Sequence, residues 1–272
     1  MRQVLETLWD ATDDLPWSML AFDEIEMDSL RWRTFRAVAE ARACKIIQRA
    51  KWQVARVAVG DDMDAYLAAL PSNHRRNVRS KERKLDAAGE VEFLAYRPQD
   101  DLQTERLVRE GFLVEDLSWK GAENSSVNRT PGALDYYTRL ALEAARLGHL
   151  ELLFLKLNGR SIAFAFNLFA KGCHFGLKMG YDPQFSRFAP GVQLVSRNLR
   201  RLHADREASV FDFYGPLLSW SAKFATHTYR IARLLTALPG TGSKLALSTY
   251  APLAGIFRHS TADSGWAATP SG

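Results

Sequence analysis

One turn of this 272-residue chain has the residue types of an anion-binding site. Pro190-Gly191 opens a segment whose apolar residues recur at helical spacing, at Val192, Val195, Leu199 and Leu202. The first N–H groups of a helix have no partner within it and carry the positive end of its dipole, so a helix start can bind pyrophosphate. Arg187 could add a charge-assisted contact. Alternatively, Pro190-Gly191 only marks the start of a helix and Arg187 is a solvated surface residue. Both interpretations stay open.

A carboxylate lies in the middle of an apolar segment further along the chain. Asp212 stands between Phe211 and Phe213 in residues 210–214, which favour a strand. A carboxylate in these surroundings could act as the base for an acceptor amine, or it could orient Lys223. The alternative is a carboxylate at a strand end that binds backbone N–H groups.

The elements before the Pro190-Gly191 turn form a predicted three-stranded meander. Its strands are residues 152–157, 162–169 and 173–179. Asn158-Gly159 is the dipeptide that suits a two-residue hairpin turn, Lys171-Gly172 makes the second turn, and Gly180-Tyr181-Asp182-Pro183 ends the third strand. A meander that opens onto a helix start could hold the pyrophosphate of an acyl-CoA.

The remaining segments alternate between predicted helices and strands. Helices are expected over residues 30–49, 61–70, 73–88, 102–117, 133–147 and 222–237, and strands over 17–22, 52–59 and 91–96. In residues 192–202 the polar residues Gln193, Arg197, Arg200 and Arg201 are expected on the outer side. Strands that alternate with helices around a meander indicate an α/β (α+β) fold with a mixed sheet.

The composition supports a packed core, and most of the net positive charge lies in one short segment. Hydrophobic residues make up 47% of the chain, and the net charge is +5. Residues 73–86 carry six basic and two acidic side chains, a net +4 within one short predicted helix. A helix this polar is usually a solvated face. It could instead contact the 3′-phosphate of CoA, a transfer RNA or an anionic membrane surface through Arg75, Arg76 and Arg79.

Several classes of protein fit the sequence poorly. No apolar run reaches the roughly 20 residues of a membrane span, and the acidic first 17 residues do not read as a secretory signal, so a cytoplasmic setting is expected. Cys44 and Cys173 lack metal or disulfide spacing, and the histidines lack paired spacing, so no metal site is expected. Gly240-Thr241-Gly242-Ser243-Lys244 has the wrong order for a phosphate-binding loop and is interpreted as linker.

The chain resembles the CelD/Fem-like branch of the GNAT acyltransferase superfamily over about residues 67–231. The order and spacing of short motifs carry the resemblance: Asn73-His74-Arg75-Arg76-Asn77-Val78-Arg79, Ser118-Trp119-Lys120-Gly121, Ile162-Ala163-Phe164, Gly180-Tyr181-Asp182-Pro183, Ala189-Pro190-Gly191, Phe211-Asp212-Phe213-Tyr214-Gly215 and Lys223-Phe224. Two features depart from the family pattern. The sequence before Trp17 is short, and Gly215-Pro216 replaces a more glycine-rich stretch.

The resemblance implies a GNAT-like, largely antiparallel mixed sheet flanked by helices. It divides the chain into a remnant of an N-terminal GNAT-like lobe (1–66), an acyltransferase lobe (67–237) and a loosely structured tail (238–272). Lys223 would stabilise negative charge on the reacting carbonyl oxygen, and Tyr181 could protonate the leaving thiolate. A solvated lysine and a turn tyrosine are the alternatives. For Trp119-Lys120-Gly121 the resemblance suggests no chemistry, and packing is the expected role.

The expected activity is direct transfer of an acyl group, acetyl in the first instance, from acyl-CoA to an amine or hydroxyl. The acceptor would be a sugar or a precursor of the cell envelope or an exopolysaccharide. Arg187, Ala189, Pro190, Gly191 and Val192 would bind acetyl-CoA as co-substrate, and no permanently bound cofactor is expected. A Fem-like transferase with an aminoacyl-tRNA donor and a non-catalytic module that binds an anionic partner are the alternatives.

Overall fold

A computed structural model describes residues 1–11 and 18–240, which fall into two compact units. The first unit comprises Met1–Val54 and residues 228–240, and the second comprises Ala55–His227. The sequence-based division into residues 1–66, 67–237 and 238–272 stays a prediction. Among the described helices, none is long and apolar enough to cross a bilayer.

The first unit packs two helices against strands. Its elements are α1 (Arg2–Asp10), β1 (Met19–Glu26), α2 (Leu30–Ala41), the first part of β2 (Lys45–Ala58) and β8 (His227–Ala237). β1 pairs with β8 in antiparallel fashion, from Met19 opposite Ala237 to Glu26 opposite Ile231. Trp9, Phe35 and Leu234 lie in the core of this unit.

Two sequence predictions in this unit were wrong. The helix expected to continue to residue 49 ends at Ala41, because Ala43 adopts a positive φ of 55° and the chain then enters β2. The helix expected over residues 222–237 is a single 3₁₀ turn, η2 (Ser221–Lys223), followed by β8. Pairing with β1 fixes β8 as a strand, and a distant pairing partner outweighs local helical spacing.

The second unit contains the other elements, in an order close to the prediction. They are α3 (Met63–Ala69), α4 (Ser72–Asp86), β3 (Val91–Tyr96), α5 (Asp101–Asp116), α6 (Trp119–Ala122), α7 (Ala133–Arg146), β4 (Leu150–Leu157), β5 (Arg160–Ala170), β6 (Cys173–Tyr181), the 3₁₀ helix η1 (Pro183–Phe188), α8 (Pro190–Asp205) and β7 (Val210–Asp212). The hydrogen-bonded strand order is β1-β8-β2-β7-β6-β5-β4-β3. The fold is therefore mixed α/β with a largely antiparallel sheet flanked by helices, as predicted.

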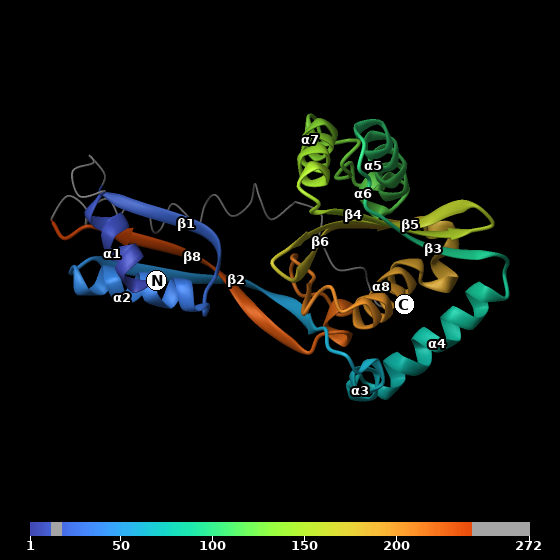
Figure 1. The fold of residues 1–272 in the computed structure, drawn as a ribbon, viewed down its shortest axis with the longest axis horizontal. Coiled ribbons are helices and arrows are strands. Elements are labelled where there is room, and N and C mark those ends of the chain that lie inside the picture. The colour runs from blue at the N-terminus through green and yellow to red at the C-terminus, as the bar shows by residue number, and fades with distance from the viewer. Residues whose placement is uncertain (12–17, 241–272) are drawn as a thin grey trace. The chain divides into compact units, whose positions relative to one another are not determined.

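Strands β3 to β6 form the centre of the second unit, with helices on both faces. Figure 1 shows α5 and α7 on one face and α8 with α4 on the other. Phe112 of α5 packs with Phe154 and Phe164 on the first face, and Leu194 of α8 packs with Leu153 and Leu155 on the second. The predicted hairpin turns are confirmed, because Asn158, Gly159, Lys171 and Gly172 all have a positive φ between 51° and 74°.

Gly111 allows α5 to lie directly on β5. A Cβ built at this position would be 2.1 Å from Cε2 of Phe164, so only glycine fits without movement of the core. Alanine has the higher helix propensity, by about 1 kcal/mol. Overpacking of a core commonly costs about 1–3 kcal/mol, and the ring of Phe164 is fully buried.

We expect Gly111→Ala to lower the free energy of unfolding by about 1–2 kcal/mol in urea denaturation, because the steric cost exceeds the gain in propensity. Gly60→Ala is the matched control, since no atom lies within 4 Å of its built Cβ. A Gly111→Ala protein at least as stable as the wild type would contradict this account of the α5–β5 contact.

Candidate active site

β6 and β7 begin as a parallel pair and then part. Three residue pairs are in register, Cys173 with Val210, His174 with Phe211 and Phe175 with Asp212. β7 ends at Asp212, whereas β6 continues to Tyr181. A register shift in the β5–β6 pairing falls at the same place, between Phe166 and Asn167. The edge of β6 after Phe175 thus offers backbone hydrogen-bonding groups to a ligand rather than to β7.

A cavity of about 40 Å³ lies where the two strands part. Its lining includes Ala165 and Asn167 of β5, Gly176 and Met179 of β6, Asn198 of α8 and Phe211 of β7. Trp220 and Ser221 approach it from the segment that follows β7. The walls are mostly apolar, and space for a few atoms suits a small acyl group.

Two asparagines place polar atoms in this apolar cavity. Asn167 is 1% exposed and Asn198 is fully buried. Within the described residues, both side-chain atoms of Asn167 and Nδ2 of Asn198 have no hydrogen-bond partner. Buried polar atoms are normally satisfied, so three unsatisfied atoms in one cavity indicate a place for water or for a polar ligand group.

The start of α8 lies at the other end of the free edge of β6. Ala189 precedes the helix in a left-handed conformation, with φ 52° and ψ 56°, and Pro190 occupies the first helical turn. Gly191 is buried against β6, where its built Cβ would be 3.5 Å from both Met179 and Tyr181. The structure therefore brings together Tyr181, Ala189, Pro190, Gly191 and Val192, as an anion site at a helix start requires.

The turn before α8 is fixed by α4. Lys81 Nζ donates a hydrogen bond of 2.8 Å to the backbone carbonyl of Arg187. The Arg187 guanidinium is exposed and lies 4.6 Å from the ring centroid of Phe188. Both cations stand beside the helix start, where they can complement a pyrophosphate.

Asp212 and Lys223 have different environments. Asp212 is fully buried, accepts a hydrogen bond of 2.6 Å from Arg56 Nε and one of 2.7 Å from the backbone N–H of Tyr214. Lys223 is exposed at the end of η2. Burial and then the charge of Lys223 hold the pKa of His74 below its ordinary value. Phe224, the residue after Lys223, packs edge-on against His74 of α4, with 4.6 Å between the ring centroids. The catalytic roles expected for Asp212, Tyr181 and Lys223 stay predictions.

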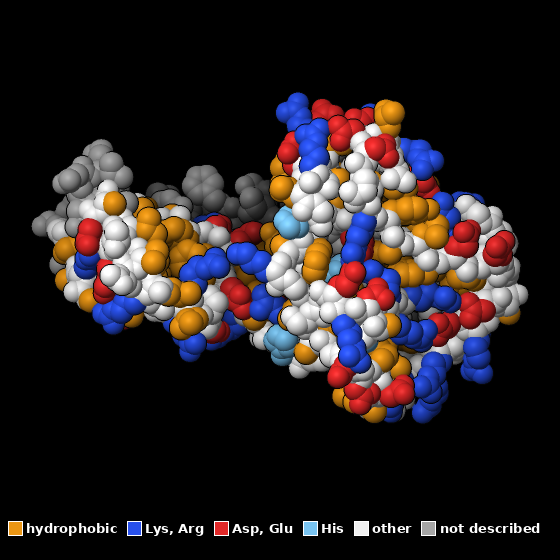
Figure 2. Space-filling view, viewed as in Figure 1, with side chains coloured by type: hydrophobic (Ala, Val, Ile, Leu, Met, Phe, Trp, Pro, Cys, Tyr) orange, Lys and Arg blue, Asp and Glu red, His pale blue; other side chains and the backbone are white. Residues whose placement is uncertain are grey.

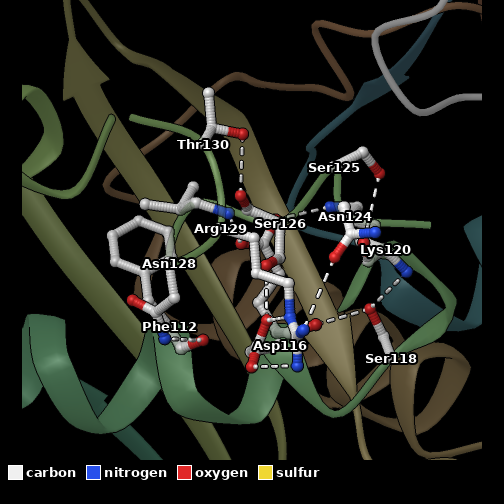
Figure 3. Close-up of polar contacts among 12 residues, drawn as sticks. Phe112, Asp116, Ser118, Lys120, Asn124, Ser125, Ser126, Asn128, Arg129 and Thr130 are labelled. Carbon is white, nitrogen blue, oxygen red and sulfur yellow. Dashed lines mark hydrogen bonds and ion pairs between the residues drawn. The ribbon is translucent and has the colours of Figure 1, made fainter. Parts of the chain in front are cut away.

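The Ser118-Trp119-Lys120-Gly121 motif anchors the helical layer to β6. Lys120 and Glu115 form a buried ion pair of 2.7 Å, and Lys120 Nζ also donates to the carbonyl of Met179 at 2.9 Å. Figure 3 shows the surrounding loop, in which Asp116 binds Arg129 and Ser118 caps α6. Met179 lines the cavity, so this motif fixes one of its walls.

Helix α4 covers α8 and is more than a solvated face. His74, Val78 and Leu85 of α4 are buried, and Glu82 binds Arg200 through both carboxylate oxygens. Gln193, expected on the outer side of α8, is fully buried and donates to the carbonyl of Val78 at 3.1 Å. That prediction was wrong because α4 packs on this side. Lys and Arg side chains still project from the edge where Figure 1 places α4 (Figure 2).

A buried charged cluster lies next to the cavity. Glu151 is fully buried and ion-paired with Arg97 and Arg201, and Arg201 Nη2 donates to Asn198 Oδ1 at 2.9 Å. His174 Nδ1 lies 3.6 Å from Glu151. Burial lowers the pKa of His174 to about 4, although the Glu151 charge acts in the opposite direction. Among the described residues, no group of three or more His, Cys, Asp or Glu could hold a metal ion.

Comparisons with known proteins identify the family and the fold. Residues 72–220, more than half of the chain, match the family described as "Acetyltransferase (GNAT) domain", and the chain belongs to that family. No curated protein sequence matches the chain significantly.

Solved structures with the same fold share little sequence. FemX is 12% identical, with a TM-score of 0.63 over 91% of this chain and 79% of its own. A conserved protein of unknown function from Bacteroides thetaiotaomicron VPI-5482 is 13% identical, with a TM-score of 0.55 over 87% and 75%. The C-terminal domain of a putative lysylphosphatidylglycerol synthetase from Agrobacterium fabrum is 15% identical, with a TM-score of 0.53 over 93% and 77%. At these identities the likeness establishes the fold alone.

The sequence predicted the helix start but missed the polar cavity atoms. Asn167 interrupts an apolar strand, which was a usable signal, because a lone amide in a buried strand needs partners. Asn198 follows Val195 by three residues and therefore shares the inner face of α8. Neither residue type indicates a site until β5 and α8 are placed around one cavity.

The buried His174 predicts a dependence of stability on pH. The unfolded chain takes up a proton near pH 6.5, whereas the folded chain resists protonation until about pH 4. The unfolded state thus binds more protons between these values, and stability falls as pH is lowered through this window. We expect a loss of about 3 kcal/mol from this group between pH 7 and pH 4.

His174→Phe should remove that part of the loss, measured as the free energy of unfolding in urea at pH 7 and pH 4.5. His149→Phe is the control, because His149 is exposed. If His174→Phe and the wild type lost the same stability on acidification, the account of His174 would be wrong.

Proposed function

We propose that the chain transfers an acyl group from acyl-CoA to an amine or hydroxyl of a sugar or a precursor of the cell envelope or an exopolysaccharide. The observation that carries the proposal is the parting of β6 and β7 above a cavity, with the start of α8 at the end of the free strand edge. Family membership supports the acyltransferase class. Acetyl-CoA is the donor to test first, and a cytoplasmic reaction would suit a CoA thioester.

The three parts of an acyl-CoA would meet three parts of this site. The pyrophosphate would lie at the start of α8, against the N–H groups of Gly191 and Val192 and near Arg187 and Lys81. The pantetheine amides would bind the free edge of β6 between Gly176 and Tyr181. The acyl group would then enter the cavity where the strands part.

The reaction would be direct attack of the acceptor on the thioester. A C–N or C–O bond forms at the acyl carbonyl carbon, the C–S bond breaks, and CoA leaves as the thiol with the proton lost by the acceptor. Alignment of two bound reactants can supply about 7–11 kcal/mol of the barrier reduction. Lys223 would stabilise the oxyanion, Tyr181 would protonate the thiolate, and Asp212 would take the acceptor proton or orient a neighbouring cation.

We expect Gly176→Val to abolish saturable binding of acetyl-CoA. A built Cβ at Gly176 lies 3.4 Å from Phe211 and 3.8 Å from Asn167 Oδ1, so the larger side chain fills the point where the strands part. Binding is measured by calorimetry on the purified chain, and folding is checked by thermal unfolding. Gly60→Val is the control, because its side chain projects into open space.

Wild-type protein that is folded and binds neither acetyl-CoA nor CoA would contradict the proposed donor. Unchanged binding by the Gly176→Val protein would contradict the proposed position of the donor in the fold.

For Lys223 we expect a loss in turnover without a loss in donor binding. Lys223→Ala should lower kcat by about 10²–10³-fold, the usual effect of removing one group that stabilises an oxyanion, with the affinity for acetyl-CoA unchanged. The assay follows release of free CoA thiol in the presence of an active acceptor. Lys171→Ala, which removes an exposed lysine of a hairpin turn, is the control. Equal kcat values for the two variants would show that Lys223 is a solvated surface residue with no role in catalysis.

A second candidate function is aminoacyl transfer from a charged transfer RNA. The shared fold with FemX and the basic side chains of α4 favour it. Arg75, Arg76 and Arg79 would then contact the phosphate backbone, and binding would weaken steeply with salt. Charge reversal at these three positions distinguishes this function, or a non-catalytic module that binds an anionic partner, from CoA-dependent transfer.

A further inference from the structure

We propose that the acyl group taken by this site carries a hydroxyl, and that Asn167 and Asn198 bind that hydroxyl. This inference rests on the proposed function, and it specifies the donor more narrowly than a plain acetyl group. The cavity where β6 and β7 part is the position for the acyl group, and its largely apolar lining contains these two buried amides.

A contact with Arg201 fixes the orientation of the Asn198 side chain. Arg201 Nη2 donates to Asn198 Oδ1 at 2.9 Å, and Arg201 is in turn ion-paired with the buried Glu151. Because a guanidinium only donates, the oxygen of this amide must face Arg201. Nδ2 is then the atom left for the cavity, and it has no partner among the described residues. Asn198 therefore presents a hydrogen-bond donor.

Asn167 supplies the complementary acceptor at the point where the strands part. Its Oδ1 would lie 3.8 Å from a Cβ built on Gly176, the first residue of β6 beyond the pairing with β7. Neither Oδ1 nor Nδ2 of Asn167 has a partner within the described part of the chain. A ligand hydroxyl both donates and accepts, so it can satisfy Asn167 Oδ1 and Asn198 Nδ2 together.

Other acyl groups fit this pair of amides less well. An alkyl chain would leave three buried polar atoms unsatisfied, which is costly in a dry cavity. An ammonium cannot accept the hydrogen bond that Asn198 Nδ2 offers, and the guanidinium of Arg201 lies behind that amide. Lys178 lines the cavity, but its Nζ lies 5.3 Å from the ring centroid of Tyr137 in α7, on the other face of the sheet. A carboxylate would be desolvated between apolar walls formed by Leu153, Ala165, Leu194 and Val195. The small volume also restricts the acyl chain to a few carbons.

The test is a comparison of matched CoA thioesters by calorimetry on the wild-type chain. The probes are butyryl-CoA, 2- and 3-hydroxybutyryl-CoA, 3-aminobutyryl-CoA, succinyl-CoA and CoA itself. We expect at least one hydroxybutyryl thioester to bind about tenfold or more tightly than butyryl-CoA, because a site that binds a hydroxyl rejects the analogue without one. The amino and succinyl thioesters should bind more weakly than the better hydroxybutyryl thioester.

The Asn167→Leu substitution tests whether Asn167 binds the hydroxyl of the acyl group. This change should reduce the preference for the hydroxyl to twofold or less while CoA itself binds as before. Asn77→Leu, the same substitution on an exposed position of α4, should keep the wild-type preference. If Asn167→Leu does not fold, Asn167→Ala gives the same comparison with less bulk.

The outcomes separate this inference from the proposed function. Equal binding of butyryl-CoA and both hydroxybutyryl thioesters, or tightest binding of succinyl- or aminobutyryl-CoA, overturns the inference and leaves acyl-CoA as donor. Absence of binding by every thioester and by CoA overturns the proposed function as well. If the preference for the hydroxyl persists in the Asn167→Leu protein, other residues bind the hydroxyl. That result overturns the assignment of Asn167 as its binding residue.

Discussion

The site depends on one constraint, which is that β6 loses its partner β7 after Phe175 while remaining inside the sheet. Backbone N–H and C=O groups within a protein need partners, so a strand edge that opens in this way is costly unless something binds it. β7 is three residues long and β6 nine, and the difference creates the opening. The cavity, the start of α8 and the segment after β7 are all arranged around that edge.

Rigid contacts on both sides keep β6 in place without β7. On one face, Lys120 links Glu115 of α5 to the carbonyl of Met179. On the other face, Leu194 of α8 is fully buried against the sheet. A buried ion pair adds little net stability, because desolvation offsets the attraction. Its value here is geometric, since removing either charge would leave the other buried and would release the wall formed by Met179.

Local signals in the sequence predicted the local parts of the fold. Asn158-Gly159 and Lys171-Gly172 determine their turns through backbone conformation, so the β4–β5–β6 meander followed directly. The same reasoning failed for residues 42–49 and 222–237, where pairing between β1, β2 and β8 decides the structure. Pro190-Gly191 was a correct helix start, whereas Asn167 and Asn198 gain significance only when residues 31 positions apart line one cavity. Distant pairing and shared cavities are not encoded in local spacing.

Helix α8 links the proposed donor site to the stability of the fold. Its first turn would face the pyrophosphate, Asn198 faces the cavity, Arg201 neutralises Glu151 and Arg200 binds α4. Substitutions that alter the preference for the acyl group therefore act on buried core contacts and change stability as well. The segment after β7 is different, because it has little regular structure and exposes Tyr214 and Lys223. The exposed side chains there can change with a smaller cost to the core than the buried residues of α8.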